Sequence, residues 1–483
     1  MKIPSKITAK RESLSFDPDH TKVITRFFEP DHQRKEHIIE RILKLDQKET
    51  IRILDQTIAN FSNRHDNIKR IFKTNYDRLS IERDLSLESR LLLGAYFTME
   101  YAIETAALLN PSIVPHPDQN ELQKNEQRVI LSFRAVGEGH MSSIVFREGV
   151  INKNGLLVIQ NNNTNFELGK INEDFLYDKK DFIIKLEEIK SYKSVKSILD
   201  NLLDKFSRAE LKESIQRFVK KYQDEMHFNQ QAIDTLLWLS KSNFEIDFDE
   251  ELDISGRVIF PRSKGEIRAL EDARFVQFQD SDGTIKYYAT YTAYDGRNIL
   301  PQLIETKNFY RFKIKTMLGS GSQNKGMALF PEKIKGKYVL ISRNDNENLF
   351  LMYSDRINYW EKPVLIRKPA FYWEYYQIGN NGSPIKTKNG WLVLTHGVGP
   401  VRTYCMGAML LDLENPGKVI KITREPILFP LENERDGYVP NVVYSCGSIV
   451  HKDYLIMPYA ISDTRSGVAR FNLKELLKSM DPC

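Results

Sequence analysis

The chain has 483 residues, 41% of them hydrophobic and 11% aromatic, so it can bury a large core. Its 70 Lys and Arg against 65 Asp and Glu give a net charge of only +5, which argues against nucleic acid or an anionic membrane as a partner. Three widely spaced cysteines exclude a disulfide framework, no Cys/His spacing indicates a metal site, and no apolar run is long enough to span a membrane. With a polar N-terminal stretch that is unlike a signal peptide, these features predict a cytoplasmic protein.

Two parts of the chain have the spacing of amphipathic helices. From residue 30 to 107, apolar residues recur at i, i+3 and i+4, and Leu91 to Leu109 continues as an apolar, Ala-rich helix. A second block runs from about Ser194 to Ser240. The sequence therefore predicts a helical N-terminal region over residues 1–107 and a mainly β domain over 108–483, with a helical insertion at about 190–245.

The remaining chain has the period-2 pattern of strands, and it repeats. Five segments share one form: a short apolar strand, a polar turn, and a second strand that ends in polar residues. Tyr288, Tyr338, Trp391 and Tyr454 occupy matching places, at spacings of 50, 53 and 63 residues, and Val129 is their counterpart in the first segment. Repeats of this length are typical of propeller blades, so we expect a five-bladed β-propeller; the alternative is a β-sandwich with hairpins.

The inner strands of propeller blades converge at one end on a common pocket. The repeats place a mixed set of polar residues at the ends of the first and second strands; it includes Asn110, Arg134, Glu271, Asp272, Arg274, Lys325, Arg343, His396 and Asp463. Acids, cations and amides together are the groups that bind a sugar and an oxyanion. Any single strand-end residue is better explained by solvation, and the functional interpretation rests on the set.

Several of these stretches together resemble family 130 of the glycoside hydrolases, which contains β-mannoside phosphorylases and β-1,2-mannosidases. They include NPSI at Asn110, SFRAVGEGHMSSIVFR at Ser132, EDAR at Glu271, NKGMALFPEKIKGKYVL at Asn324, and SPIKTKNGWLVLTHGVG. The resemblance covers about residues 108–170 and 255–475 and implies a five-bladed propeller. The family motif EDPR is EDAR here, with Ala273 in place of proline, and both helical regions go beyond the short family members.

The resemblance also implies roles for individual residues. Asp272 would be the proton donor, and Arg274 a neighbouring ligand of the substrate or of an anion. Arg134, Lys325 and His396 would hold inorganic phosphate, with Arg147 as a further candidate. Asn110 and Asp463 would bind the mannosyl unit, and Arg343 is assigned to substrate binding from its place at a strand end. Because adjacent strand residues point to opposite faces, Glu271 is expected to be structural.

Phosphate is already a charged nucleophile, so phosphorolysis needs one acid and cations, whereas inverting hydrolysis needs a second carboxylate as base. The predicted activity is therefore cleavage of β-mannosides by inorganic phosphate, with inversion, to give α-mannose 1-phosphate. For Asp272 to act as an acid near neutral pH, its pKa must be raised, or the proton must pass through a sugar hydroxyl.

Two other functions are compatible with the sequence. One is a β-1,2-mannosidase of the same family; the other is a non-catalytic carbohydrate-binding propeller. In each case the expected partners are small oligosaccharides, with phosphate as co-substrate of the phosphorylase and no further cofactor, metal, nucleic acid or membrane. The helical regions are candidates for contacts between subunits of a homo-oligomer.

Overall fold

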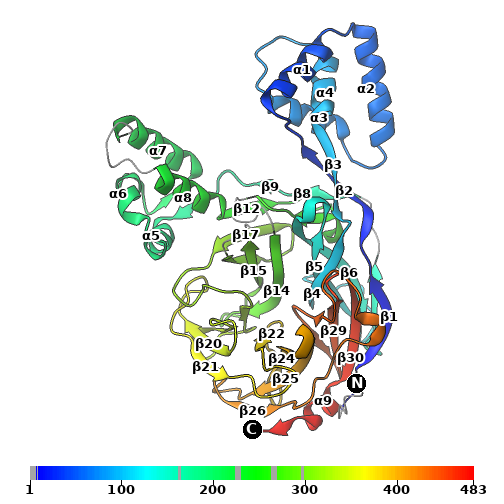
Figure 1. The fold of residues 1–483 in the computed structure, drawn as a ribbon, viewed down its shortest axis with the longest axis vertical. Helices are drawn as coiled ribbons and strands as arrows, with labels where there is room; N and C mark the ends of the chain where they lie inside the picture. Colours follow the sequence, from blue (N-terminus) through cyan, green and yellow to red (C-terminus); the bar gives the residue numbers. More distant parts are fainter. Residues whose placement is uncertain (1–6, 8, 161–164, 223–229, 263–268, 295–298) are drawn as a thin grey trace.

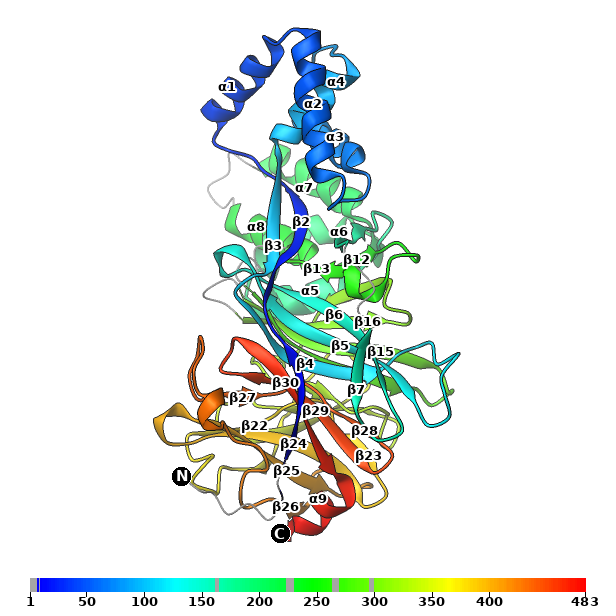
Figure 2. The ribbon, with the colours of Figure 1, turned by 90° about the vertical axis from the view of Figure 1, so that its right-hand side faces the viewer.

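The computed structural model is mainly β, and it describes residues 7, 9–160, 165–222, 230–262, 269–294 and 299–483. The molecule is elongated, with strands packed at one end and two helical bodies that project from them (Figures 1 and 2). None of the helices in these ranges is both long and apolar enough to cross a membrane.

The N-terminal helical body stands on a two-stranded ribbon. Strands β2 (Asp19–Phe27) and β3 (Thr98–Glu104) form the ribbon, and between them in sequence lie α1 (His32–Leu43), α2 (Gln47–Phe61), α3 (Ile68–Asp77) and α4 (Leu87–Tyr96). The helices pack around their own apolar core, with Leu92, Leu93 and Phe97 fully buried. Figure 2 shows this body at the far end of the ribbon from the sheets.

The N-terminal region is less helical than expected. The helix that the sequence predicts from Leu91 to Leu109 ends at Tyr96, and the chain continues as β3. Thr98 pairs with Phe27 and Glu104 with Asp19, so pairing with β2 determines the conformation of a segment whose composition suits a helix. Strand β1 (Lys10–Phe16) leaves this region altogether and pairs with β30 (Arg465–Asn472) near the other end of the chain.

Among the described residues, the strands after β3 that belong to the repeats fall into five antiparallel strand groups. Group 1 is β4 (Ala107–Pro115), β5 (Gln127–Val136), β6 (Ser142–Ile151) and β7 (Leu157–Gln160). Group 2 is β14 (Ala269–Gln279), β15 (Ile285–Tyr294), β16 (Ile299–Thr306) and β17 (Arg311–Thr316). Group 3 is β18 (Ala328–Leu329), β19 (Tyr338–Ser342), β20 (Leu349–Ser354) and β21 (Val364–Arg367).

The last two groups each begin with an interrupted strand. Group 4 is β22 (Gln377–Asn380) and β23 (Ile385–Thr387), which both pair with β24 (Gly390–Val398), followed by β25 (Tyr404–Leu411) and β26 (Val419–Ile422). Group 5 is β27 (Val443–Tyr444) and β28 (Ile449–His451), which both pair with β29 (Tyr454–Ile461), then β30, with β1 on its outer side. After β30 come α9 (Leu473–Ser479) and β31 (Asp481–Pro482), which pairs with β26.

The sequence repeat corresponds to these groups. Each of the five matching residues lies on the second strand of its group's first hairpin: Val129 on β5, Tyr288 on β15, Tyr338 on β19, Trp391 on β24 and Tyr454 on β29. Groups 1 and 2 form one sheet through the parallel pairing of Ser142 on β6 with Ala269 on β14. Short strands extend this sheet: β13 (Arg257–Ile259) pairs with β6 and with β8 (Glu167–Leu168), and β12 (Phe244–Asp247) pairs with β17 and with β9 (Lys170–Ile171).

Each strand group packs on the next through a separate apolar cluster. Ile144 of group 1 lies with Phe275 of group 2, Val276 of group 2 with Leu340 of group 3, and Ile341 of group 3 with Val393 of group 4. Leu392 and Leu455 join groups 4 and 5, and Phe133 and Ile456 join groups 1 and 5. Burying one such side chain contributes about 1.5–3 kcal/mol, so these contacts stabilise a closed series in which group 5 meets group 1.

The helical insertion is a second projecting body. It contains α5 (Lys179–Glu188), α6 (Tyr192–Asp200), α7 (Arg208–Tyr222) and α8 (Gln230–Lys241), with β10 (Tyr177–Asp178) and β11 (Lys205–Phe206), around a core of its own. The helices begin before the expected start at about residue 190. Asp181 of α5 accepts a hydrogen bond from Asn358 at 2.8 Å, which ties the insertion to group 3.

Candidate active site

Interruptions in the first strands of the groups position the polar residues. The register of β4 shifts between Leu109 and Ser112, and that of β14 shifts between Glu271 and Arg274. Inside these bulges, Asn110 and Asp272 have positive φ angles of 51° and 56°. Such backbone conformations are unfavourable for residues other than glycine, and they concentrate at functional sites. The strained segments bring Asn110 and Asp272 together, with 2.5 Å between the amide nitrogen and Oδ1.

The carboxyl group of Asp272 is ionised in this arrangement. Burial acts to raise its pKa, but the positive charges of Arg274, Arg134 and Lys325 and the hydrogen bond from Asn110 outweigh burial and hold the pKa below its ordinary value. Of the two alternatives for a proton donor, a raised pKa is therefore absent in this arrangement, and transfer through a sugar hydroxyl stays a prediction. The sequence could not show the direction of the pKa shift, because the cations come from separate strand groups.

Arg274 is held by protein groups on all sides. Its Nη2 donates to the Tyr444 hydroxyl at 2.6 Å, its Nε to the carbonyl of Asn381 at 2.6 Å, and its Nη1 to the carbonyl of Asp272 at 2.9 Å. The residue is only 2% exposed. Arg274 therefore fixes the strained Asp272 backbone, a positioning task that differs from the substrate contact expected from the sequence.

Glu271 also belongs to the site. Its carboxylate forms two ion pairs, one with Nη2 of Arg134 at 3.2 Å and one with the ammonium group of Lys325. Strand alternation, from which we expected a structural Glu271 facing away from Asp272, does not hold across the bulge, so adjacent carboxylates both reach the cluster. Glu271 thus forms ion pairs with Arg134 and Lys325, the two cations that the sequence analysis assigns to phosphate binding.

His396 enters the cluster as a neutral ring. Its Nε2 lies 3.3 Å from Nη1 of Arg343, and its Nδ1 lies 2.9 Å from the side-chain oxygen of Asn381. A guanidinium cannot accept, so Nε2 accepts and Nδ1 carries the proton. Burial, with Arg343 and Arg274 nearby, holds the pKa of His396 well below its ordinary value. In this arrangement the ring is neutral and orients Arg343, and the binding of phosphate by His396 stays a prediction.

Asp463, in contrast to Asp272, has a raised pKa. Burial is the largest cause; the carboxylates of Asp272 and Glu271 act in the same direction, and Arg134 and Arg402 oppose them, so the pKa of Asp463 rises to about 6. The residue follows β29 and has a φ of 51°. Its position beside two other carboxylates depends on the closure of group 5 on group 1 and has no local sequence signal.

The structure does not bring Arg147 to this cluster. Its Nη2 lies 2.5 and 2.7 Å from the carboxylate oxygens of Glu104, which is fully buried, and Lys22 adds a contact of 3.3 Å to the same carboxylate. Arg134 pairs with Ile144, three residues from Arg147 on β6, so the two arginines point to opposite faces of the sheet. Arg147 is therefore a structural ion-pair partner here.

Some buried polar atoms around the cluster lack hydrogen-bond partners. They are Oδ1 of Asn110, Nε of Arg343, Nδ2 of Asn381 and Oγ of Ser383. Buried polar atoms in proteins are nearly always paired, so these positions are suited to the hydroxyl and oxygen groups of a ligand or to ordered water. Within the residues that the structure describes, no group of three or more His, Cys, Asp or Glu side chains is placed to hold a metal ion.

Comparison with known proteins decides the family. The sequence model of glycoside hydrolase family 130, described as beta-1,4-mannooligosaccharide phosphorylase, matches residues 215–482. The chain belongs to this family. The matched residues include Asp272, Lys325, His396 and Asp463 of the cluster, whereas Asn110 and Arg134 precede them.

Curated relatives extend the similarity. The chain is 39% identical over 225 residues to a 1,2-beta-oligomannan phosphorylase of Thermoanaerobacter sp. (strain X514), covering 45% of this chain and 73% of that protein. It is 31% identical over 231 residues to a beta-1,2-mannobiose phosphorylase of Listeria innocua, covering 46% of this chain and 63% of the relative. A solved complex of a Listeria innocua beta-1,2-mannobiose phosphorylase with beta-1,2-mannobiose covers 78% of this chain and 92% of the other, with 22% identity and a TM-score of 0.45.

Proposed function

We propose that this family 130 protein cleaves β-mannosides with inorganic phosphate and releases α-mannose 1-phosphate. The observation that carries the proposal is the convergence of Arg134 and Lys325, from different strand groups, beside the buried carboxylate of Asp272. Two cations next to one acid suit a phosphate nucleophile. The names of the relatives at 39% and 31% identity support a β-1,2 linkage as the preferred substrate.

The residues suggest how the reaction proceeds. Phosphate would replace Glu271 as the ion-pair partner of Arg134 and Lys325. Its negative charge would weaken the stabilisation that these two cations give to the Asp272 carboxylate, and the pKa of Asp272 would rise. Hydrogen phosphate brings one proton, which the ionised Asp272 takes up as its pKa rises. As the bond from the anomeric carbon to the leaving oxygen breaks and a bond to phosphate forms on the opposite face, Asp272 passes a proton to the leaving oxygen. The products are α-mannose 1-phosphate and an alcohol, so protons balance.

The sugar would lie on the remaining side of the cluster. Asn110 and Asp463 are proposed to bind the mannosyl hydroxyls, since both face Asp272 from strained strand ends. Arg343, oriented by His396, is proposed to contact the substrate through its unpaired Nε. Arg274 would act through the backbone of Asp272.

One observation favours hydrolysis as a second candidate. In an inverting hydrolase a carboxylate must activate water, and Asp463, with a pKa of about 6, is a titratable carboxyl near Asp272. Glu271 already neutralises the two cations, which a water nucleophile would not require. A phosphate-independent activity on β-mannosides would agree with this reading.

We further propose that strand groups 1 to 5 are the blades of a five-bladed propeller over residues 108–483, with residues 1–107 and about 190–245 as accessory regions. The support is the five repeated hairpins and the apolar clusters between successive groups, including groups 5 and 1. The projecting helical bodies in Figure 1 are the proposed surfaces for homo-oligomer contacts. The free thiols of Cys405, Cys446 and Cys483 support a reducing, cytoplasmic location.

The test is the reverse reaction. The protein is incubated with α-mannose 1-phosphate and mannose, glucose, N-acetylglucosamine or short β-mannosides, and phosphate release is followed. Asp272→Asn is the inactive variant, and Asp282→Asn, on the exposed turn after β14, is the matched control. Acceptor-dependent release that only Asp272→Asn lacks would establish phosphorolysis. No release, together with hydrolysis of β-1,2-mannobiose without phosphate, would establish the hydrolase, and binding without turnover would indicate a non-catalytic protein.

A further inference from the structure

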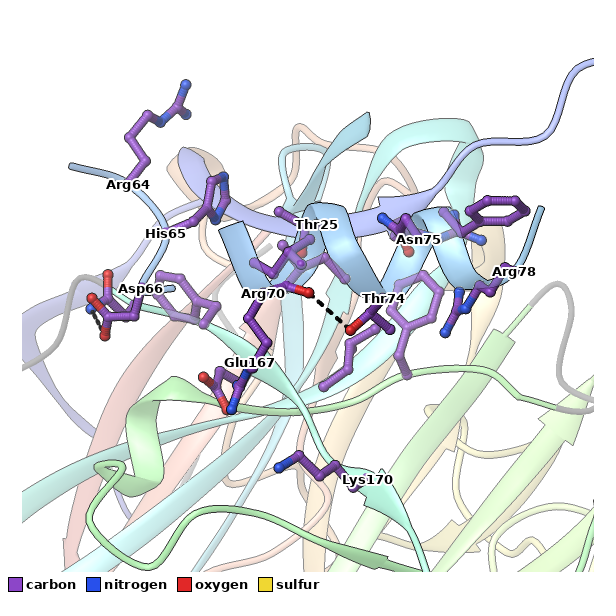
Figure 3. Close-up of a pocket in the computed structure, with 18 of the residues that line it drawn as sticks. Thr25, Arg64, His65, Asp66, Arg70, Thr74, Asn75, Arg78, Glu167 and Lys170 are labelled. Atoms are coloured by element: carbon purple, nitrogen blue, oxygen red, sulfur yellow. Dashed lines mark hydrogen bonds between the residues drawn. The ribbon is translucent and has the colours of Figure 1, made fainter. Parts of the chain in front are cut away.

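A second cleft lies where the N-terminal helical body meets the sheets, and it shares no residue with the active site. Its volume is about 630 Å³, which suits a ligand the size of a nucleotide or a disaccharide. Helix α3 and strand β2 form one wall, and the segment that carries β8 and β9 forms the other (Figure 3). Residues Phe260 to Arg262 also line the cleft.

The lining of this cleft is strongly cationic. Six basic side chains contribute to it, against the carboxylates of Asp66 and Glu167; they are Arg26, Arg64, Arg70, Arg78, Lys170 and Arg262. Arg64 is paired with Glu100 at 2.9 Å, and Asp66 accepts a hydrogen bond from Asn165 at 2.6 Å. The positive charge of the six basic side chains is therefore only partly balanced by carboxylates in or near the cleft.

Several of the cations keep their N–H groups available. Within the part of the chain that the structure describes, no carboxylate forms an ion pair with Arg26, Arg70, Arg78 or Lys170. Arg26 lies over the rings of Tyr101 and Phe260, at 5.1 and 4.9 Å, and Arg78 lies over Phe27 at 5.5 Å. Stacking on a ring orients a guanidinium without using its in-plane donors.

The donors are arranged in a row. Arg70 and Thr74 of α3 and its C-cap residue Arg78 follow each other at steps of four, so they lie on one face of the helix. In Figure 3, Arg70 and Thr74 extend from α3 toward the strand segment of Glu167 and Lys170. The Thr74 hydroxyl donates to the backbone carbonyl of Arg70 at 2.9 Å, so the donors that remain for a ligand are two guanidinium groups facing an ammonium group. These match the acceptor oxygens of phosphate better than those of a neutral sugar.

We propose that this cleft binds a small organic phosphate, either a sugar phosphate or a nucleotide, and thereby fixes the helical body to the sheets. The ligand would join α3 to β9 at the place where the body otherwise depends on the β2–β3 ribbon and the Asp66–Asn165 hydrogen bond. The site is independent of the proposed phosphorolysis and requires no turnover.

The experiment measures binding and its location on the full chain. Adenosine diphosphate and α-mannose 1-phosphate are the probes, with adenosine and mannose as analogues without phosphate; calorimetry gives affinity, and amide hydrogen exchange reports on residues 68–77 and 165–171. The variant is Arg70→Ala with Arg78→Ala. The matched control is Lys69→Ala with Lys73→Ala, which removes the same charge from exposed positions of α3 outside the cleft.

A phosphate-bearing probe is expected to bind, to slow exchange in α3, and to bind about tenfold or more weakly to the arginine variant while the lysine control keeps its affinity. Which probe does so identifies the source of the phosphate. If neither probe protects α3 in the wild-type protein, or if both variants lose affinity equally, the proposal is wrong. The exchange measurement needs no variant, so it stands even if the arginine variant folds poorly, and activity assays do not enter it.

Discussion

Replacing Glu271 with glutamine would test whether this carboxylate competes with phosphate. The substitution keeps the shape of the side chain and removes the negative charge that Arg134 and Lys325 now share. At 3.2 Å and an effective dielectric constant of 20, the attraction between one such pair is at most about 5 kcal/mol. The side chains of Arg134 and Lys325 are 23% and 32% exposed, so water screens much of it.

A net competition of about 1–2 kcal/mol remains, which corresponds to about 5- to 30-fold tighter binding of inorganic phosphate by Glu271→Gln. The assay is calorimetric titration with phosphate at low ionic strength. Glu305→Gln, which breaks the distant ion pair with Lys286, is the control and should bind phosphate as the wild type does. Unchanged or weaker phosphate binding by Glu271→Gln would refute the idea that phosphate displaces this carboxylate.

Three further outcomes are expected. Arg147→Met leaves the buried Glu104 without its main partner and should lower the free energy of unfolding by about 3–5 kcal/mol in urea titrations, with the KM for phosphate unchanged. Asp463 has a folded-state pKa of about 6 against an ordinary value of 3.8, so the folded protein binds the extra proton, and the free energy of unfolding falls as pH rises from about 4 to 6. Asp463→Asn should therefore be more stable than the wild type at pH 7 by about 1–2 kcal/mol. In thermal melts this difference should vanish below about pH 4. Tyr438 is 72% exposed, stacks on His140 at 5.7 Å, and lies near Asp463 because its backbone N–H donates to the Thr464 hydroxyl at 3.0 Å. An exposed ring beside the proposed sugar ligand Asp463 can stack on the mannoside. Tyr438→Ala should therefore raise the KM for the mannoside about 2- to 12-fold and leave the KM for phosphate unchanged.

The sequence predicted the parts of the structure that depend on local pattern. The five hairpins follow from period-2 alternation and from the matching aromatic residues, such as Tyr288 and Trp391, which pack on the second strand of each hairpin. The gathering of Asp272, Arg134 and Lys325 at one site also followed, because strand ends of repeated units converge.

What the sequence could not show depends on contacts between distant segments. Strand β3 forms because β2 is there to pair with it, and Arg147 is neutralised by Glu104 at the end of that strand. The orientation of Glu271 depends on a bulge, which breaks the alternation used to assign it a structural role. The directions of the pKa shifts of Asp272 and Asp463 reflect charges brought in by other strand groups.

The pairing of β1 with β30 has a consequence for biosynthesis. Lys10 lies beside Arg470, and Phe16 beside Ser466, so β1 cannot pair until β30 has been made. At about 5–20 residues per second, a ribosome needs roughly 20–90 seconds to make the intervening chain, and β1 has no partner in that time. Pairing of β1 therefore follows the synthesis of β30, and a nascent chain whose β1 is sequestered or trimmed would leave β30 as an open edge available to another molecule.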